Sequence, residues 1–246
     1  MKKRADQLLH DRGLCESRTA AQRLIQAGLV RIGDDFLVDK PSLLVDEEAD
    51  LRVVAPCPYV SRGAYKLLAA LERFRPELAG RIALDVGAST GGFTDLLLQH
   101  GVAKVYAVDV GYGQLHLKLR GDPRVVCLER LNARHLSARE VPEPVDLLVS
   151  DVSFISLTKV LPACAPLLKP GGLAFLLVKP QFEARREEIG KNGVVRDEAV
   201  RQRCVREICE FAERELGWRL LGVEPSPITG PKGNQEYIAA FATPAA

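Results

Sequence analysis

The feature that most constrains the fold is an alternation of short apolar runs with helical stretches, which continues from residue 61 to the end of the chain. The apolar runs cover residues 82–86, 105–110, 145–149, 173–178, 220–223 and 237–241. Strands and helices that alternate in this way indicate a mainly parallel sheet with helices on both faces. Ligands of such sheets bind beyond the carboxyl ends of the strands. The sequence therefore predicts an α/β fold with a site at that edge.

The first 28 residues have a helical pattern. Leu8 and Leu9 precede an interruption at Gly13. Ser17 is placed to cap a second helix, and Gly28 is placed to end it. This segment predicts two consecutive helices.

Two short apolar runs, residues 29–32 and 36–38, flank Gly33-Asp34-Asp35. They indicate a tight β-hairpin, to which residues 51–54 can add a strand. Pro56 and Pro58 then resist both helix and sheet. We therefore expect a small α+β domain over residues 1–55, a linker over 56–60 and a larger domain over 61–246.

Charge is divided unevenly within the small domain. Residues 1–31 carry seven basic and three acidic side chains, whereas residues 32–51 carry one basic and seven acidic side chains. A polyanion would be attracted to the first segment and repelled by the second. A solvated surface of uneven charge is the alternative interpretation. The candidate polyanion contacts are Lys3, Arg4, Arg18 and Arg23.

Composition argues against export, membrane insertion and metal binding. No apolar segment of about 7–15 residues follows the basic start of the chain, as a secretory signal requires. The apolar run 173–178 is much shorter than the roughly 18 residues of a membrane span. The six cysteines lack metal-ligand spacing, which favours reduced thiols. We expect a cytoplasmic protein with no metal site.

A glycine-rich turn follows the first strand of the larger domain. Its spacing, G-x-x-x-G-G from Gly87, differs from both dinucleotide-binding and P-loop motifs, so a pyrophosphate cradle is disfavoured. Asp109 ends the next strand, where α/β nucleotide sites place a carboxylate for ribose hydroxyls. A carboxylate that accepts two hydroxyl bonds would hold adenosine without phosphate donors. Asp85, the glycines and Asp109 together predict a site for a nucleoside methyl donor.

Two further charged residues end strands at the same edge. Asp151 follows the run 145–150, and Lys179 follows the run 173–178. A lysine at the end of an apolar strand is unfavourable to bury without a partner. A structural ion pair between Lys179 and Asp151 is one explanation, and a catalytic role is the other.

The chain resembles a known family at four separated motifs. Lys66 in Ser-Arg-Gly-Ala-Tyr-Lys, Asp151 in Ser-Asp-Val-Ser-Phe, Lys179 in Val-Lys-Pro-Gln-Phe-Glu and Glu236 in Gly-Asn-Gln-Glu-Tyr match the Lys-Asp-Lys-Glu tetrad of FtsJ-like ribose 2′-O-methyltransferases. Over nearly its whole length the chain resembles the TlyA, or hemolysin A, family of rRNA cytidine 2′-O-methyltransferases. Residues 17–42 are similar to the RNA-binding domain of a small-subunit ribosomal protein and of pseudouridine synthases.

The resemblance implies a Rossmann-like methyltransferase fold, S-adenosylmethionine as cofactor, and rRNA or ribosomal subunits as partners. It implies that Lys179 is the base or orients the hydroxyl, since a lysine can take a proton only when neutral and burial or a second cation favours that form. Asp151 and Lys66 would tune Lys179, and Glu236 would position Lys66 or the ribose. Asn132 stands where many methyltransferases carry an acid near the adenine. The implied cofactor contacts are Asp85, Gly87, Ala88, Ser89, Gly91, Gly92, Phe93, Asp109, Asn132 and Asp151.

Two other functions remain as alternatives. One is a non-catalytic RNA-binding factor in ribosome assembly, against which the complete tetrad argues. The other is a membrane-lysing toxin, suggested by the family's second name, but no amphipathic or spanning segment supports it.

Overall fold

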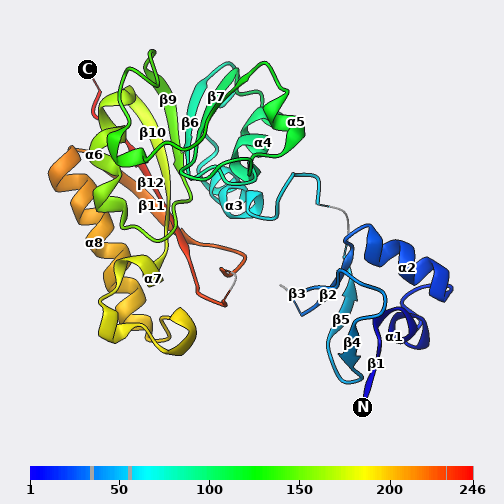
Figure 1. Ribbon diagram of the computed structural model, residues 1–246. Helices are drawn as coiled ribbons and strands as arrows, with labels where there is room; N and C mark the ends of the chain where they lie inside the picture. The colour runs from blue at the N-terminus through cyan, green and yellow to red at the C-terminus, as the bar shows by residue number, and fades with distance from the viewer. Residues whose placement is uncertain (34–35, 55–56, 231, 246) are drawn as a thin grey trace. The chain divides into compact units, whose positions relative to one another are not determined.

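The computed structural model describes residues 1–33, 36–54, 57–230 and 232–245. It divides into two compact units, Met1–Pro58 and Tyr59–Ala246, which are described separately below (Figure 1). Asp34 and Asp35 of the expected hairpin turn, and Ala55 and Pro56 before and within the expected linker, lie outside the described residues.

The small unit contains two helices and two small sheets. Its helices are α1 (Ala5–Asp11) and α2 (Arg18–Gln26), and its sheets have the strand orders β3-β2-β5 and β1-β4. The strands are β1 (Lys2–Arg4), β2 (Val30–Ile32), β3 (Phe36–Leu37), β4 (Leu44–Asp46) and β5 (Leu51–Val53). The Ser17 side chain accepts a hydrogen bond from the Ala20 amide at 3.1 Å, which confirms the predicted cap.

The β1-β4 pairing was not predicted from the sequence. Strands β1 and β4 pair in an antiparallel register, with Lys3 opposite Val45. Arg4 is the last residue of β1 and directly precedes α1. Three-residue strands are too short to show a clear apolar alternation, and only their pairing across about forty residues defines them. The two helices bury Leu9 and Ile25 in a common core.

One buried carboxylate connects these elements. Asp6 is fully buried and accepts hydrogen bonds from Arg4 at 3.0 Å, Arg18 at 3.2 Å and Gln22 at 3.0 Å. The Arg4 guanidinium is the main cause that holds the pKa of Asp6 well below its usual range. Asp6 therefore joins β1 to α2 through charge-assisted hydrogen bonds.

The larger unit contains a seven-stranded sheet in the order β11-β12-β10-β9-β6-β7-β8. Strand β12 runs antiparallel to its neighbours β10 and β11, and the other neighbouring pairs are parallel. The strands are β6 (Ile82–Val86), β7 (Lys104–Val108), β8 (Val125–Leu128), β9 (Val145–Ser150), β10 (Leu168–Val178), β11 (Arg219–Pro225) and β12 (Tyr237–Ala242). The predicted mainly parallel sheet is confirmed, but β8, a four-residue strand at the edge, was missed.

Helices cover both faces of this sheet, as predicted. One face packs against α3 (Ala64–Phe74), α4 (Gly92–Gln99) and α5 (Leu117–Arg120), and the other against α6 (Leu161–Cys164) and α8 (Glu198–Leu216). Neighbouring strand residues alternate between the two cores: Leu147 packs with the first set and Leu148 with the second. Figure 1 shows α8 and α3 on opposite sides of the strands.

The remaining helical elements are short. They are α7 (Pro180–Glu183) and the 3₁₀ turns Ala133–His135, Leu157–Lys159, Ala165–Leu167, Arg186–Glu188 and Lys191–Gly193. In the part of the chain that the structure describes, no helix has the length and apolar character needed to cross a bilayer.

We predict that replacing Asp6 by Ala destabilises the small unit by about 2–3 kcal/mol, because three donors lose their shared acceptor. The loss is smaller than for a wholly buried ion pair because the Arg4 and Arg18 side chains remain 44% and 50% exposed. Hydrogen exchange of α1 and α2, followed by mass spectrometry on the full-length chain, measures the change. Asp11→Ala, at an exposed pair with Lys3, is the control. Equal protection in the two variants would contradict this role.

Candidate active site

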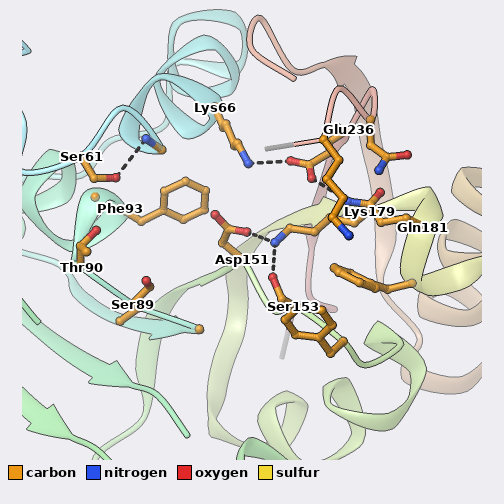
Figure 2. Close-up of a pocket in the computed structure, with 18 of the residues that line it drawn as sticks. Ser61, Lys66, Ser89, Thr90, Phe93, Asp151, Ser153, Lys179, Gln181 and Glu236 are labelled. Atoms are coloured by element: carbon orange, nitrogen blue, oxygen red, sulfur yellow. Dashed lines mark hydrogen bonds and ion pairs between the residues drawn. The ribbon is translucent and has the colours of Figure 1, made fainter. Parts of the chain in front are cut away.

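Two adjoining cavities open at the carboxyl edge of the sheet. Their volumes are about 640 Å³ and about 440 Å³. They share five lining residues, which come from the turn after β6 and the segment after β9: Gly87, Ser89, Asp151, Ser153 and Phe154. Figure 2 shows Asp151 and Lys179, which follow two parallel strands, around the larger cavity. Lys66 and Glu236, from segments far apart in the chain, lie at the same cavity. The arrangement offers one compartment for a cofactor and another for a substrate group.

Two glycines shape the turn after β6. Gly87 has a φ of +85°, and a Cβ atom there would lie 2.8 Å from the Asp151 carbonyl oxygen, so only glycine fits. Gly91 has a φ of +95° and directly precedes α4, and a Cβ atom there would overlap with the Leu119 side chain. It lines neither cavity, in contrast to Ala88, Gly92 and Phe93, which line the larger one. Gly91 therefore shapes the turn by allowing Leu115 and Leu119 to pack against it, and it does not border either cavity.

Asp109 and Asn132 line the smaller cavity. The Asp109 carboxylate accepts the backbone amide of Ser89 at 2.8 Å and that of Gly111 at 2.7 Å. Asn132 accepts the Arg134 amide at 3.1 Å through its side-chain oxygen. Both side chains are thus fixed by backbone donors. Each Asp109 oxygen keeps a second lone pair for a ligand, whereas the Asn132 oxygen also accepts from Arg134 Nε at 3.4 Å.

Asp85 lies below the turn and lines the larger cavity. It is fully buried, and its Oδ2 accepts the Thr94 hydroxyl at 2.6 Å. Its Oδ1 has no hydrogen-bond partner among the described residues. Burial raises the pKa of Asp85 to about 7, and the nearby charges of Asp151 and Asp109 act in the same direction.

The four residues of the tetrad meet in the larger cavity as two ion pairs. Lys66 Nζ lies 2.6 Å from Glu236 Oε2, and Lys179 Nζ lies 2.5 Å from Asp151 Oδ1. Both lysines and Glu236 are buried, and Asp151 is partly exposed. Figure 2 shows the two pairs facing the same space. The ion pair considered as the structural alternative for Lys179 and Asp151 is therefore present, but it borders an open cavity.

Four different elements supply these side chains. Lys66 lies in the first turn of α3, while Asp151 and Lys179 directly follow β9 and β10. Glu236 precedes its strand, and it reaches the same edge because β12 is antiparallel and pairs Tyr237 with Val178. The one antiparallel strand in the sheet thus completes the cluster.

Three site residues were missed in the sequence, although they lie within the matched motifs. Ser153 accepts a hydrogen bond from Lys179 Nζ at 2.8 Å. Gln181 donates from its amide to Glu236 at 3.0 Å, an orientation that the carboxylate dictates because it only accepts. Asn234 accepts from the Val195 amide at 3.0 Å and donates to the Gly193 carbonyl at 2.9 Å.

Asn234 joins two segments that lie about forty residues apart in the chain. Its bonds hold Gly193, in the charge-dense stretch after α7, against the loop that leads to Glu236. Ile189, Gly193 and Asn234 all line the larger cavity. This part of the stretch is therefore a wall of the cavity, whereas residues 198–216 form the helix α8.

The candidate RNA contacts lie in the small unit and differ in their surroundings. Lys3 pairs with Asp11 at 3.3 Å, and Arg4 and Arg18 are held by Asp6. Arg23 is exposed on α2, and its side chain forms no ion pair with another residue in the described ranges.

We predict that Asp85→Asn stabilises the larger unit more at pH 8 than at pH 5. The folded state holds the Asp85 proton up to about pH 7, but the unfolded state holds it only to about pH 4, so the wild-type free energy of unfolding falls as the pH rises between these values. Asparagine stays neutral and avoids this loss, with a difference on the order of 2–3 kcal/mol between the two pH values.

Urea unfolding without cofactor, followed by fluorescence, measures this difference. The single tryptophan, Trp218, is buried in the larger unit and reports on that unit alone. The same stabilisation at both pH values would show that Asp85 is ionised throughout. Asp122→Asn, at an acid in an exposed pair with Arg124, is the matched control.

Comparison with family models assigns both units. Residues 59–243 match the FtsJ-like methyltransferase model, and residues 3–51 match the S4 domain model. These matches confirm the predicted methyltransferase fold and the predicted ribosomal-protein type of the N-terminal domain.

The relatives agree with the family models. The 16S/23S rRNA (cytidine-2′-O)-methyltransferase TlyA of Mycobacterium tuberculosis is 50% identical over 96% of this chain and 88% of its own length. Hemolysin A of Brachyspira hyodysenteriae is 41% identical over 97% of this chain and 99% of its own. The solved structure of a candidate hemolysin of Streptococcus thermophilus is 42% identical, with a TM-score of 0.78 over 99% of this chain and 89% of its own. The chain therefore belongs to the FtsJ-like methyltransferases and, among them, to the TlyA, or hemolysin A, family.

Proposed function

We propose that this chain transfers a methyl group from S-adenosylmethionine to the 2′-hydroxyl of a cytidine ribose in rRNA. The observation that carries the proposal is the cluster of Lys66, Asp151, Lys179 and Glu236 beside the glycine turn. The M. tuberculosis relative named for this reaction supports the choice of substrate. With rRNA as its substrate, we expect the enzyme to act in the cytoplasm.

The residues present fit a nucleoside methyl donor. In the smaller cavity, Asp109 offers lone pairs for the ribose hydroxyls, and Asn132 places an amide side chain beside the base. Asp85, which lines the larger cavity, keeps in its Oδ1 an acceptor without a partner among the described residues. Asp151 lines both cavities, where they adjoin. When bound, S-adenosylmethionine supplies an electrophilic methyl group on a sulfonium.

The reaction also requires that the 2′-hydroxyl lose its proton. Lys179 borders the cavity and, in its neutral form, accepts that proton. Asp151, 2.5 Å away, stabilises the ammonium ion that results. The Lys66–Glu236 pair, which Gln181 braces, forms the opposite side and positions the ribose. Alignment of the hydroxyl within this rigid frame supplies much of the rate.

An aromatic side chain stands at the mouth of both cavities. Phe154 is 90% exposed and adopts a φ of +64°, which is unusual for a bulky residue. Its ring centroid lies 5.0 Å from that of Phe182. Unstacked bases in RNA commonly stack on such rings, so Phe154 offers a face for the target base.

The small unit supplies affinity for the RNA. We assign residues 1–55 to an RNA-binding domain and residues 56–60 to a linker, with Lys3, Arg4, Arg18 and Arg23 as phosphate contacts. The match of residues 3–51 to the S4 model and the basic excess of residues 1–31 support this assignment. Phosphate contacts of this kind increase affinity with little dependence on base sequence.

Replacing Lys179 by Ala tests the catalytic assignment. We expect transfer from labelled S-adenosylmethionine to rRNA and to ribosomal subunits to fall by about 10²–10⁴-fold, because the proton acceptor is lost. The Kd for the cofactor should stay within about twofold, since the groups around Asp109 are untouched. Lys159→Ala, at an exposed lysine outside both cavities, is the matched control. Undiminished turnover in the Lys179→Ala variant would exclude this lysine as the base.

The charge reversal Arg23→Glu tests the RNA-binding assignment. We expect weaker rRNA binding and a slope of log K against log salt that is smaller by about one, because one phosphate contact is lost. Lys40→Glu makes the same charge change in the acidic segment and should have less effect. Filter binding at several salt concentrations measures both. If the two reversals weaken binding equally, net charge and not the basic face determines affinity.

A further inference from the structure

Ser153 contacts the lysine that the proposed mechanism uses, but neither motif matching nor the family comparison gives it a role. Its Oγ accepts a hydrogen bond from Lys179 Nζ at 2.8 Å. The same nitrogen lies 2.5 Å from Asp151 Oδ1. Figure 2 shows that the contacts of the Lys179 amine with Asp151 and Ser153 leave the nitrogen in different directions. Two acceptors from one short segment therefore hold one nitrogen.

The backbone fixes this segment on both sides of Ser153. Val152 is buried in the core beneath the sheet edge, and the Cβ position forbidden at Gly87 borders the backbone of residues 151 and 152. Phe154, the next residue, takes the left-handed conformation that turns the chain outward. Ser153 thus stands at a defined point of the cavity wall, with its side chain toward Lys179.

A tetrahedral amine held by two acceptors has a defined third direction. Lys179 Nζ donates a hydrogen bond to Ser153 and forms an ion pair with Asp151. When neutral Lys179 turns one N–H toward each of them, its lone pair takes the remaining tetrahedral position. With Asp151 alone, the amine can rotate about the bond to its carbon and spend most of its time misdirected. We propose that Ser153 is a positioning residue that directs the lone pair of Lys179 toward the target 2′-hydroxyl.

This role rests on the proposed function, and its proton balance is complete. The O–H bond of the ribose breaks, and its proton joins the Lys179 nitrogen. The oxygen forms a bond to the methyl carbon, while the carbon–sulfur bond breaks and leaves its electron pair on sulfur. Ser153 gains and loses no atom, and it continues to accept from the ammonium that forms.

Other groups around Lys179 do not set this direction. The Phe182 ring lies 5.8 Å from its nitrogen, a contact that favours the cation without orienting a lone pair. Lys66 and Glu236 share the cavity but are paired with each other. Asp85 lies below the glycine turn and is bound to Thr94. Among the described residues, Asp151 and Ser153 are the acceptors within hydrogen-bond distance of this nitrogen.

The test compares Ser153→Ala with wild type over a range of pH, using saturating cofactor and rRNA. We expect the high-pH plateau of kcat to fall about 10- to 100-fold, because a misdirected reacting group loses alignment. The KM for rRNA and the Kd for the cofactor should stay within about twofold. Ser153→Thr, which keeps the hydroxyl, should restore most of the rate.

Any of the following outcomes would contradict the positioning role of Ser153. A plateau within twofold of wild type would show that Asp151 orients the amine alone. A fall in kcat with weaker cofactor binding, or an equally slow Ser153→Thr variant, would show that the side chain supports only the local structure. Ser137→Ala, in a distant loop where Ser137 contacts Glu140, controls for loss of a surface hydroxyl.

The same assay distinguishes a failure of the Ser153 role from a failure of the proposed function. If wild type transfers methyl groups to rRNA and Lys179→Ala does not, a normal Ser153→Ala variant refutes the positioning role alone. If wild type shows no transfer to rRNA, or if Lys179→Ala retains it, the proposed function fails and the role of Ser153 fails with it.

Discussion

The pairing of β6, β9 and β10 is the constraint on which the site depends. Val86 pairs with Ser150, and Ser150 pairs with Leu176, so the three parallel strands end at the same edge. Their next residues supply Gly87, Asp151 and Lys179 without any further folding of loops. Because buried backbone groups must be hydrogen-bonded, the register of these strands is strongly fixed, and so is the spacing of the groups that they carry.

The buried charges of the site are stabilised by ion pairs. A buried lysine or carboxylate without a partner is strongly unfavourable, and Lys66 and Lys179 each face one acid within 2.6 Å. Asp85 is the exception, because Thr94 satisfies only one of its oxygens. Such a residue lowers stability at high pH, and strain of this kind is typical of sites that are shaped for a ligand.

The small unit also depends on a buried charge, which here stabilises the fold of a small domain. It has few residues with which to build a core, and Asp6 links its helices and first strand by using Arg4 and Arg18. These two arginines remain about half exposed, so they support the fold and still present positive charge. A structural and an RNA-binding role for them are therefore compatible.

The alternation of apolar runs was enough to predict the two-faced sheet and six of its strands, and the local motifs named Asp85, Gly87, Asp109 and the tetrad. The β1-β4 pair and β8 were missed because strands of three or four residues at an edge carry little pattern of their own. Sequence distance also hid the contacts of Ser153 and Asn234, since a hydrogen bond between distant segments leaves no local signal. Thus the sequence by itself determined the elements and the kinds of chemical groups. The sequence left open whether Lys179 pairs with Asp151 and whether Glu236 reaches Lys66. The tertiary structure decided both, because they depend on the antiparallel direction of β12 and on the register of strands far apart in the chain.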